Sequence, residues 1–322
     1  MRSETRLHRD PRAWRAADIG EGPSWYHPLP EPCAADLVGR ARELARGPVP
    51  LVETRLGEAD RSAWSAAFRP VLDALENRCG FAIIEGPRAE ALSPAERAAL
   101  YWIVGQALGE PVAQNVQGTL LYDVRDTGQY VSQGARFSVT NAESTFHTDA
   151  SFEPEVVDYV GLLCLQTARS GGLSQIVSGY AVVEELAEHH PEALAELTRP
   201  FHVDRRGGVR PGEASTALRP IIERNGGRLL WRYLRTWIEV GHQKVGEPLT
   251  EVQMRALDVL DQVANRPEMR VEFLMRPGEM FFINNRWILH NRTAFEDHPE
   301  PERRRHYLRL WLRARAGHES AA

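Results

Sequence analysis

The sequence predicts an α+β protein in which a helical N-terminal portion precedes a β sandwich or barrel. Helical periodicity and helix caps dominate the first third of the 322 residues. After residue 110, short strand-like runs are separated by clusters of glycine, proline and aspartate. Because no repeat, low-complexity tract or linker divides the chain, we expect a single domain over residues 1–322, with a mainly helical portion at 1–78 and the β core at about 80–313.

The first third of the chain is expected to contain three helices and one strand. The helices are predicted at 34–46, 59–78 and 93–108. The third has the clearest start, with Ser93 as the capping residue, Pro94 at the first helical position and Glu96 three residues after the cap. The apolar run 81–84 favours a buried strand between the second and third helices.

The β region is expected to contain several short strands and one helix. The strands are predicted at 159–165, 218–223, 228–233, 271–275, 280–284 and 306–312. The helix begins at a capping box formed by Thr250 and Gln253 and runs to about residue 266.

Composition and charge exclude several classes of function. A formal net charge of −5 argues against a general nucleic-acid binder, which needs a basic surface. No apolar run is long enough to span a membrane, and the N-terminal ten residues do not resemble a secretory signal. The three cysteines are widely spaced and lack a C-x-x-C pair, which argues against a thiolate zinc site. We therefore expect a cytoplasmic protein with a small-molecule partner, and the sequence leaves open whether it forms a homo-oligomer.

Two histidines and an aspartate form a candidate metal site. His147 and Asp149 are two residues apart, so in an extended chain both side chains point to the same face. His290 follows an apolar run far along the chain. Two histidines and one carboxylate leave open coordination positions for non-haem iron, but the same three groups with a water could also hold zinc in a hydrolase.

A strand near the C-terminus carries two arginines that favour an anionic ligand. Along 305–312, strand periodicity places the arginines and two aromatic residues on one face and three leucines on the other. If the leucines pack on the core, Arg305 and Arg309 line a polar cavity. A guanidinium group binds a carboxylate through two parallel hydrogen bonds, which suits a dicarboxylate.

These motifs and their order resemble the taurine dioxygenase and clavaminate synthase-like family of iron(II)/2-oxoglutarate oxygenases. The shared segments, in chain order, are 146–149, 171–174, 290–295 and 305–309. The resemblance covers roughly residues 80 to 313. It implies a double-stranded β-helix, also called a jelly roll, with flanking helices and with the metal at one open end of the barrel.

The resemblance also implies roles for individual residues. Iron(II) is expected on His147, Asp149 and His290, and Arg305 is expected to pair with the distal carboxylate of the cosubstrate 2-oxoglutarate. Ser174 stands where the family commonly has a threonine that contacts the same carboxylate. The remaining arginine, Arg309, is expected nearer the metal, where it meets either the other carboxylate or an anionic substrate group.

The implied reaction is hydroxylation of an unactivated C–H bond with O2, releasing succinate and carbon dioxide. Related halogenases replace the aspartate ligand with a small residue, so Asp149 argues against halogenation. Desaturation on the same scaffold, a zinc hydrolase and a non-catalytic binding module remain as alternatives.

The substrate is expected to be a small polar metabolite that is amino-acid-like or bears a carboxylate. Glu143 lies four residues before His147, where a carboxylate could receive an amine. Tyr233 and Arg235 share one face of a predicted strand and are further candidates for substrate contact.

Overall fold

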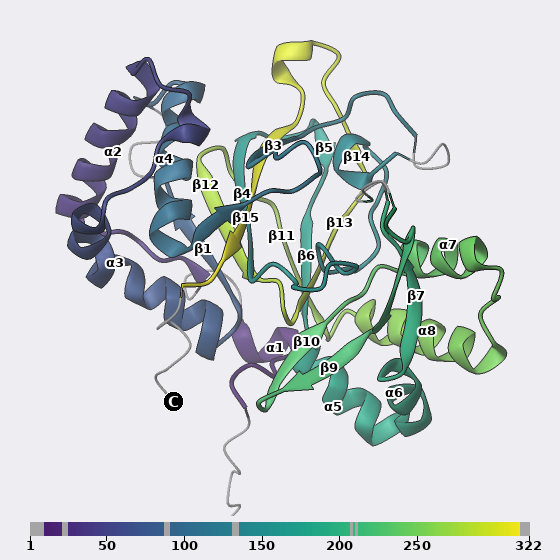
Figure 1. Ribbon diagram of the computed structural model, residues 1–322. Helices are drawn as coiled ribbons and strands as arrows, with labels where there is room; N and C mark the ends of the chain where they lie inside the picture. The colour runs from purple at the N-terminus through teal and green to yellow at the C-terminus, as the bar shows by residue number, and fades with distance from the viewer. Residues whose placement is uncertain are drawn as a thin grey trace, which may run out of the picture.

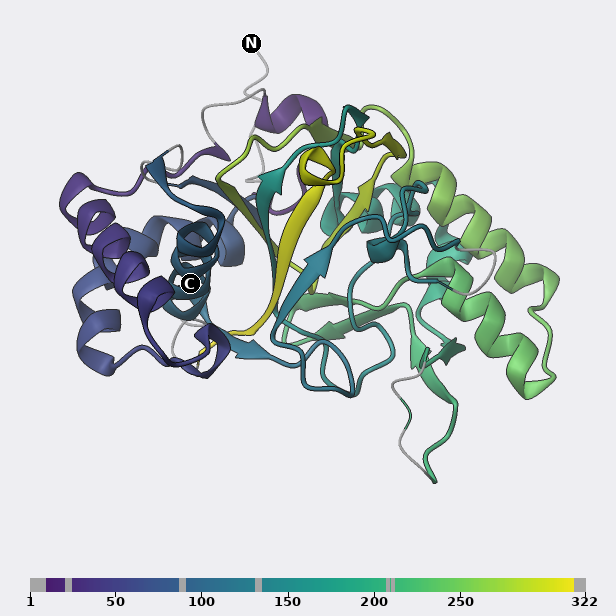
Figure 2. The ribbon, with the colours of Figure 1, turned by 90° about the horizontal axis from the view of Figure 1, so that it is seen from above.

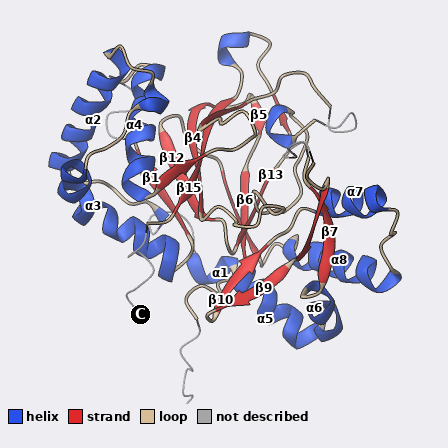
Figure 3. Cartoon of the chain, viewed as in Figure 1, coloured by secondary structure: helices blue, strands red, loops and turns tan. Residues whose placement is uncertain are grey.

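Two β-sheets lie at the centre of the molecule, and helices flank them on both sides (Figures 1 and 3). The computed structural model describes residues 10–20, 25–86, 91–130, 135–206, 209 and 212–315. The larger sheet has the strand order β1 (Phe81–Glu85), β12 (Glu279–Asn284), β4 (Tyr159–Gln166), β15 (His306–Arg313) and β2 (Glu110–Val112), and β3 (Leu121–Val124) also pairs with β15. The smaller sheet has the order β11 (Arg270–Phe273), β6 (Ser174–Ser178) and β13 (Ile288–Arg292).

The two sheets pack together through one apolar core. Phe281 and Val160 of the larger sheet belong to the same buried cluster as Ile176 and Leu289 of the smaller sheet. All strand pairs are antiparallel, and three two-stranded pairs extend the barrel. These pairs are β5 (Ser170–Gly171) with β14 (Phe295–Glu296), β7 (Pro200–Asp204) with β8 (Thr216–Pro220), and β9 (Ile222–Asn225) with β10 (Arg228–Trp231). The predicted α+β jelly roll is confirmed.

Three N-terminal helices cover the outer face of the larger sheet: α2 (Glu31–Arg46), α3 (Glu58–Asn77) and α4 (Pro94–Leu108). The short α1 (Ala16–Ile19) lies apart from them, because the Ala16 amide donates to the Glu268 carbonyl before β11 and Arg15 pairs with Glu185 of α5. Leu308, Leu310 and Leu312 of β15 pack in the same core as α4, as strand periodicity predicted. The predicted cap of α4 is also present, because Ser93 Oγ accepts from the Glu96 amide at 3.3 Å and the Glu96 carboxylate accepts from the Ser93 amide at 2.9 Å.

Four helices, not the single one predicted, occupy the other side of the barrel (Figure 2). They are α5 (Gly179–His189), α6 (Pro191–Leu197), α7 (Arg235–Val245) and α8 (Glu251–Ala264). The first of them directly follows β6, because Ser178 ends the strand and its Oγ accepts from the Ala181 amide at 3.2 Å. Because no loop separates the strand from the helix, the sequence pattern changes from strand to helix periodicity without a visible boundary, and the helix was not predicted.

The strand predicted at 218–223 is in fact two strands that pair with different partners. One ends at Pro220 and pairs with β7, and the next begins at Ile222 and pairs with β10. Proline has no amide hydrogen to donate to a continuing ladder, so the chain changes partner here. Within the described residues, no helix is long and apolar enough to cross a membrane.

Short 3-10 helices lie in the loops between these elements. They lie at Leu51–Glu53, Phe137–Val139 and Pro301–Arg303. The second of them borders the cavities at the open end of the barrel.

Candidate active site

His147 and His290 meet at the open end of the barrel through their own backbones. The His147 amide donates to the His290 carbonyl at 3.0 Å, and the His290 amide donates back to the His147 carbonyl at 2.9 Å. His290 belongs to β13, so this pair of bonds attaches the 140–149 segment to the edge of the smaller sheet. The two imidazole rings therefore lie side by side, with centroids 4.2 Å apart.

Asn285 fixes the backbone of Asp149. Its side-chain oxygen accepts from the Asp149 amide at 2.8 Å, while its nitrogen donates to the Asp149 carbonyl at 3.0 Å. Asn285 is fully buried at the end of β12, so the position of the carboxylate is tied to the larger sheet. Ala150 follows with a φ of 56°, a backbone conformation that turns the chain away directly after the carboxylate.

Both oxygens of the Asp149 carboxylate accept hydrogen bonds, and the contact to Oδ1, from Arg309 Nη1 at 3.4 Å, is the longest of them. Trp311 Nε1 donates to Oδ2 at 2.8 Å, and Arg309 Nη1 donates to the same atom at 3.1 Å. The other oxygen, Oδ1, lies 3.8 Å from His147 Nε2. One ligand atom from each of His147, Asp149 and His290 lies within 4.8 Å of the others, so the three side chains could hold one metal ion.

Electrostatics keep these groups in the protonation states that a cation requires. Burial raises the pKa of Asp149, but Arg309 and the two histidines outweigh it and lower that pKa to about 2. Burial, followed by the neighbouring His147, lowers the pKa of His290 to about 3. Burial also lowers the pKa of His147, whose Nδ1 lies 2.8 Å from the Thr145 carbonyl and so carries the proton of the neutral ring. Nε2 is left as its free ligand atom.

Arg305 and Ser174 line a small cavity on one side of the histidines. The cavity has a volume of about 90 Å³, and His147, His290 and Arg309 also line it. Arg305 is 3% exposed, and in the part of the chain that the structure describes its Nε and Nη1 atoms have no hydrogen-bond partner. Its guanidinium lies over the ring of Tyr307, 3.9 Å from the centroid. Buried N–H groups normally have an acceptor, so a buried guanidinium with unused N–H donors favours the binding of an anionic ligand.

Arg309 stands between this cavity and a second one. Besides Asp149, it binds Gln114, whose Oε1 accepts from Arg309 Nε at 2.8 Å. Its guanidinium lies 5.2 Å from the ring centroids of both Tyr122 and Trp311. Arg309 is therefore held in a fixed orientation beside the carboxylate.

The second cavity is larger and shares His147 and Arg309 with the small cavity. Its volume is about 250 Å³, and His147, Asp149 and Arg309 line one end. We call it the inner cavity. Its remaining wall combines two further guanidinium groups with apolar and aromatic side chains: Arg136, Arg206, Phe152, Leu234, Trp237 and Val240.

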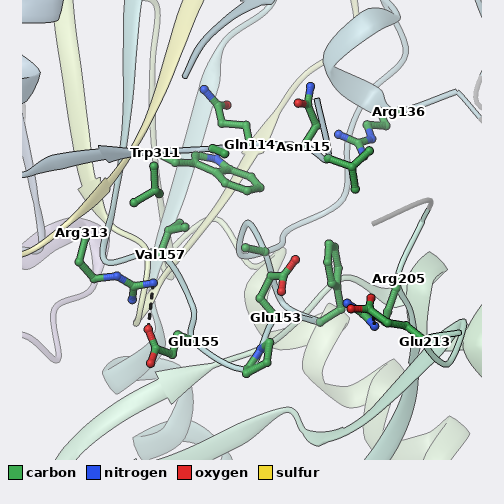
Figure 4. A pocket seen from close by; sticks show the side chains of 16 residues that line it. Gln114, Asn115, Arg136, Glu153, Glu155, Val157, Arg205, Glu213, Trp311 and Arg313 are labelled. Atoms are coloured by element: carbon green, nitrogen blue, oxygen red, sulfur yellow. Dashed lines mark ion pairs between the residues drawn. The ribbon is translucent and has the colours of Figure 1, made fainter. Parts of the chain in front are cut away.

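A wider groove of about 550 Å³ opens next to the inner cavity (Figure 4). Four residues line both spaces and so mark their junction: Gln114, Arg136, Phe152 and Trp311. The charged residues farther out form ion pairs with each other, since Arg205 lies 2.9 Å from Glu213 and Arg313 lies 3.3 Å from Glu155.

Three residues predicted as substrate contacts do not line any of these spaces. Glu143 is exposed on the segment before His147. The Tyr233 hydroxyl is buried and donates to Asp261 Oδ1 at 2.6 Å. Arg235 forms ion pairs with three carboxylates of α7 and α8 because the chain turns into a helix at this point instead of continuing as a strand. The predicted substrate contacts of these three residues therefore gain no support from the three spaces described above.

The structure adds residues that the sequence did not single out. Asn285 and Gln114 act through contacts across 136 and 195 residues of sequence, for which no local signal exists. Arg136 reaches the inner cavity from an irregular segment. The position of Trp311 was predictable, because it shares a strand face with Arg309, but its bond to Asp149 was not.

The fold and the site together define a class, the jelly-roll proteins with two histidines and one carboxylate at the open end of the barrel. The model of the family described as taurine catabolism dioxygenase TauD, TfdA matches residues 46–311. The chain belongs to this family. Membership confirms both the resemblance seen in the sequence and the enzyme class, a 2-oxoglutarate-dependent dioxygenase.

Two relatives illustrate the range of the family. The chain is 28% identical over 323 residues to FR-33289 synthase of Streptomyces rubellomurinus, which covers 95% of this chain and 90% of the relative. It is 30% identical over 240 residues to a uridine-5'-phosphate dioxygenase of a Streptomyces species, which covers 70% of this chain and 82% of the relative.

Solved structures share the fold at low sequence identity. An asparagine oxygenase in complex with Fe(II), hydroxyasparagine and succinate superposes with a TM-score of 0.70 at 20% identity, covering 89% of this chain and 93% of that one. The non-heme iron oxygenase OrfP in complex with Fe and alpha-ketoglutaric acid superposes with a TM-score of 0.63 at 17% identity, covering 90% and 94%.

Proposed function

We propose that this protein hydroxylates an unactivated C–H bond of a small polar metabolite, with iron(II) bound by His147, Asp149 and His290. Two neutral imidazoles and one ionised carboxylate are a donor set that suits iron(II) and leaves adjacent coordination positions open. The orientation of Asp149 supports this, because the shorter bonds from Trp311 and Arg309 go to Oδ2, while Oδ1 lies 3.8 Å from His147 Nε2 and has a longer contact to Arg309, at 3.4 Å.

The observation that carries the proposal is the buried guanidinium of Arg305, whose Nε and Nη1 atoms have no hydrogen-bond partner among the described residues. Its orphan donors and the Ser174 hydroxyl line the small cavity beside the histidines. A dicarboxylate that reaches from the metal into this cavity satisfies those donors with its distal carboxylate. Arg292 lines the same cavity, and burial lowers its pKa to about 9, so a second guanidinium group also favours an anion there. These features fit 2-oxoglutarate.

Iron(II) and 2-oxoglutarate, when bound, supply the activation of dioxygen, with succinate and carbon dioxide as co-products. The residues of this chain position the reactants. Asn285 holds the Asp149 backbone and Trp311 holds its carboxylate. Phe152 and Trp237 form an apolar wall that holds a substrate carbon near the metal and limits access of water.

The substrate is proposed to carry an anionic group. The carboxylates that line the inner cavity, among the described residues, are limited to Asp149, whereas three arginines line it. The proteins that this chain resembles include an asparagine oxygenase and a uridine-5'-phosphate dioxygenase, whose names indicate small polar substrates. This agrees with a small polar substrate that bears a carboxylate or another anion.

The proposal is tested by adding iron(II) and 2-oxoglutarate under anaerobic conditions and then admitting oxygen. We expect a weak visible charge-transfer band without oxygen, and succinate release with oxygen that candidate substrates stimulate. Mass analysis of the product distinguishes the alternatives, since hydroxylation adds one oxygen and desaturation removes two hydrogens. A zinc hydrolase would form no band, need no oxygen and have no use for Arg305, and that result would overturn the proposal.

Trp311→Phe is expected to weaken iron(II) affinity roughly 10- to 100-fold, the usual cost of losing a partner that orients a metal ligand. The change removes the 2.8 Å bond from the indole to Asp149 Oδ2 while keeping an aromatic ring. Competition with a chelator of known affinity measures the effect. Trp237→Phe is the matched control, because Trp237 lines the same cavity without a bond to Asp149. Equal affinities of the two variants would show that the indole does not orient the carboxylate.

A further inference from the structure

The inner cavity presents more positive than negative side chains to a ligand. Arg136, Arg206 and Arg309 line it, and Asp149 is the carboxylate among its described lining residues. Of the three guanidinium groups, Arg309 is the one that binds this carboxylate, at 3.1 Å. A divalent metal ion and the dianion of 2-oxoglutarate cancel in charge, so the excess of positive charge persists when both are bound.

Arg136 is the group best placed to meet a substrate. The described part of the chain places no carboxylate within ion-pair distance of its guanidinium, which donates a long hydrogen bond, 3.5 Å, from Nη2 to the Arg206 carbonyl. Burial, and then Arg309 and Arg206, lower its pKa, whereas Tyr122 and Asp149 raise it. A half-buried guanidinium held near other guanidinium groups gains most from an added anion.

The position of Arg136 also fixes which end of a ligand it would bind. Arg136 lines both the inner cavity and the wider groove next to it, whereas His147 and Asp149 line the inner cavity but not the groove. An anionic group at Arg136 therefore sits at the junction of the two spaces. The rest of the molecule then extends along Phe152 and Trp237, whose ring centroids are 5.6 Å apart, toward the histidines.

We propose that the substrate carries a phosphoryl dianion that binds Arg136 at this junction, with an apolar carbon segment directed toward His147 and Asp149. This inference rests on the proposed oxygenase function and names the substrate class of the same site. A dianion suits a cavity wall on which three guanidinium groups face one carboxylate, and its tetrahedral oxygens accept hydrogen bonds from Arg136 in several directions.

The test compares three probes that share a three-carbon chain: propyl phosphate, propyl sulfate and butyrate. The phosphate ester has a second pKa of about 6 and is a dianion at about pH 7.5, whereas the sulfate ester is a tetrahedral monoanion and butyrate is a planar one. Each probe is titrated by calorimetry into the anaerobic enzyme with iron(II) and 2-oxoglutarate. We expect propyl phosphate to bind at least about tenfold more tightly than either monoanion, as expected for an additional charge-assisted bond.

Arg136→Gln is expected to weaken propyl phosphate binding by about 10- to 100-fold, with partial recovery in Arg136→Lys. The matched control is Arg205→Gln, which removes the same charge from the neighbouring wall. Arg205 is already paired with Glu213 at 2.9 Å, so its loss should change binding less than about twofold. Equal binding of the three probes, or equal effects of the two glutamine variants, would overturn the inference.

The same experiment separates this inference from the proposed function. The charge-transfer band reports on iron(II) and 2-oxoglutarate alone, and we expect Arg136→Gln to retain it. A wild-type chain that forms the band but binds the probes equally contradicts the phosphoryl inference and leaves the oxygenase proposal intact. A chain without the band overturns the oxygenase proposal, while the titration still measures the anion preference of the cavity.

Discussion

Replacing His290 by alanine is expected to abolish the anaerobic charge-transfer band and to reduce succinate release by more than about 100-fold. Loss of a residue that only supports a metal ligand already costs up to about 100-fold, and His290 is itself a ligand. The reason is geometric. His290 supplies one of the three ligand atoms that lie within 4.8 Å of each other, and the remaining pair, His147 and Asp149, offers two donors. Two donors do not hold iron(II) against water and chelating buffers.

The matched control for this variant is His189→Ala. His189 is a half-exposed histidine at the end of α5, and its ring lies 3.3 Å from Glu185. It lines neither the small cavity nor the inner cavity. We expect normal iron binding in this variant. Thermal unfolding of both metal-free variants checks that the fold survives, since His290→Ala keeps the backbone bonds to His147. A His290→Ala protein that still binds iron(II) with wild-type affinity would contradict the proposed ligand set.

The strand at 305–312 shows how far the sequence alone could predict the site. Its alternation of leucines with arginines and aromatics was informative because the strand lies between a helical layer and the barrel interior, so each face has its own chemistry. The same logic failed at Tyr233 and Arg235. There the chain leaves the strand for α7, and two of the carboxylates that pair with Arg235, Asp258 and Asp261, lie on α8, which is distant in sequence.

Residues that complete the cavities were beyond the reach of sequence patterns for a related reason. Asn285 holds the Asp149 backbone through contacts that depend on how β12 lies relative to the 140–149 segment. Arg136 enters the inner cavity from an irregular segment whose course no periodicity specifies. Motif spacing identified the groups expected to do the chemistry, whereas the groups that orient them and recognise the substrate required the fold.

Arg305→Ala is expected to raise the KM for 2-oxoglutarate by about 100-fold, which corresponds to about 3 kcal/mol of lost binding free energy. Arg305 is 3% exposed, and its Nε and Nη1 atoms have no hydrogen-bond partner within the described residues. The carboxylate of the cosubstrate can therefore bind these atoms without displacing another group. Since iron(II) affinity depends on other residues, the metal should still bind. The KM is measured from succinate release at saturating substrate.

The neighbouring Arg304 supplies an unusually close control for this prediction. Arg304→Ala removes the same side chain one position earlier, but Arg304 is exposed and donates to the carbonyls of His298 and Pro299 at 3.3 and 3.1 Å. Of these two arginines, Arg305 is the buried one and the one that lines the small cavity. We expect Arg304→Ala to change the KM less than about twofold, as for most surface charges. If both variants raised the KM equally, the effect would come from net charge, and the buried guanidinium would not be the carboxylate-binding group.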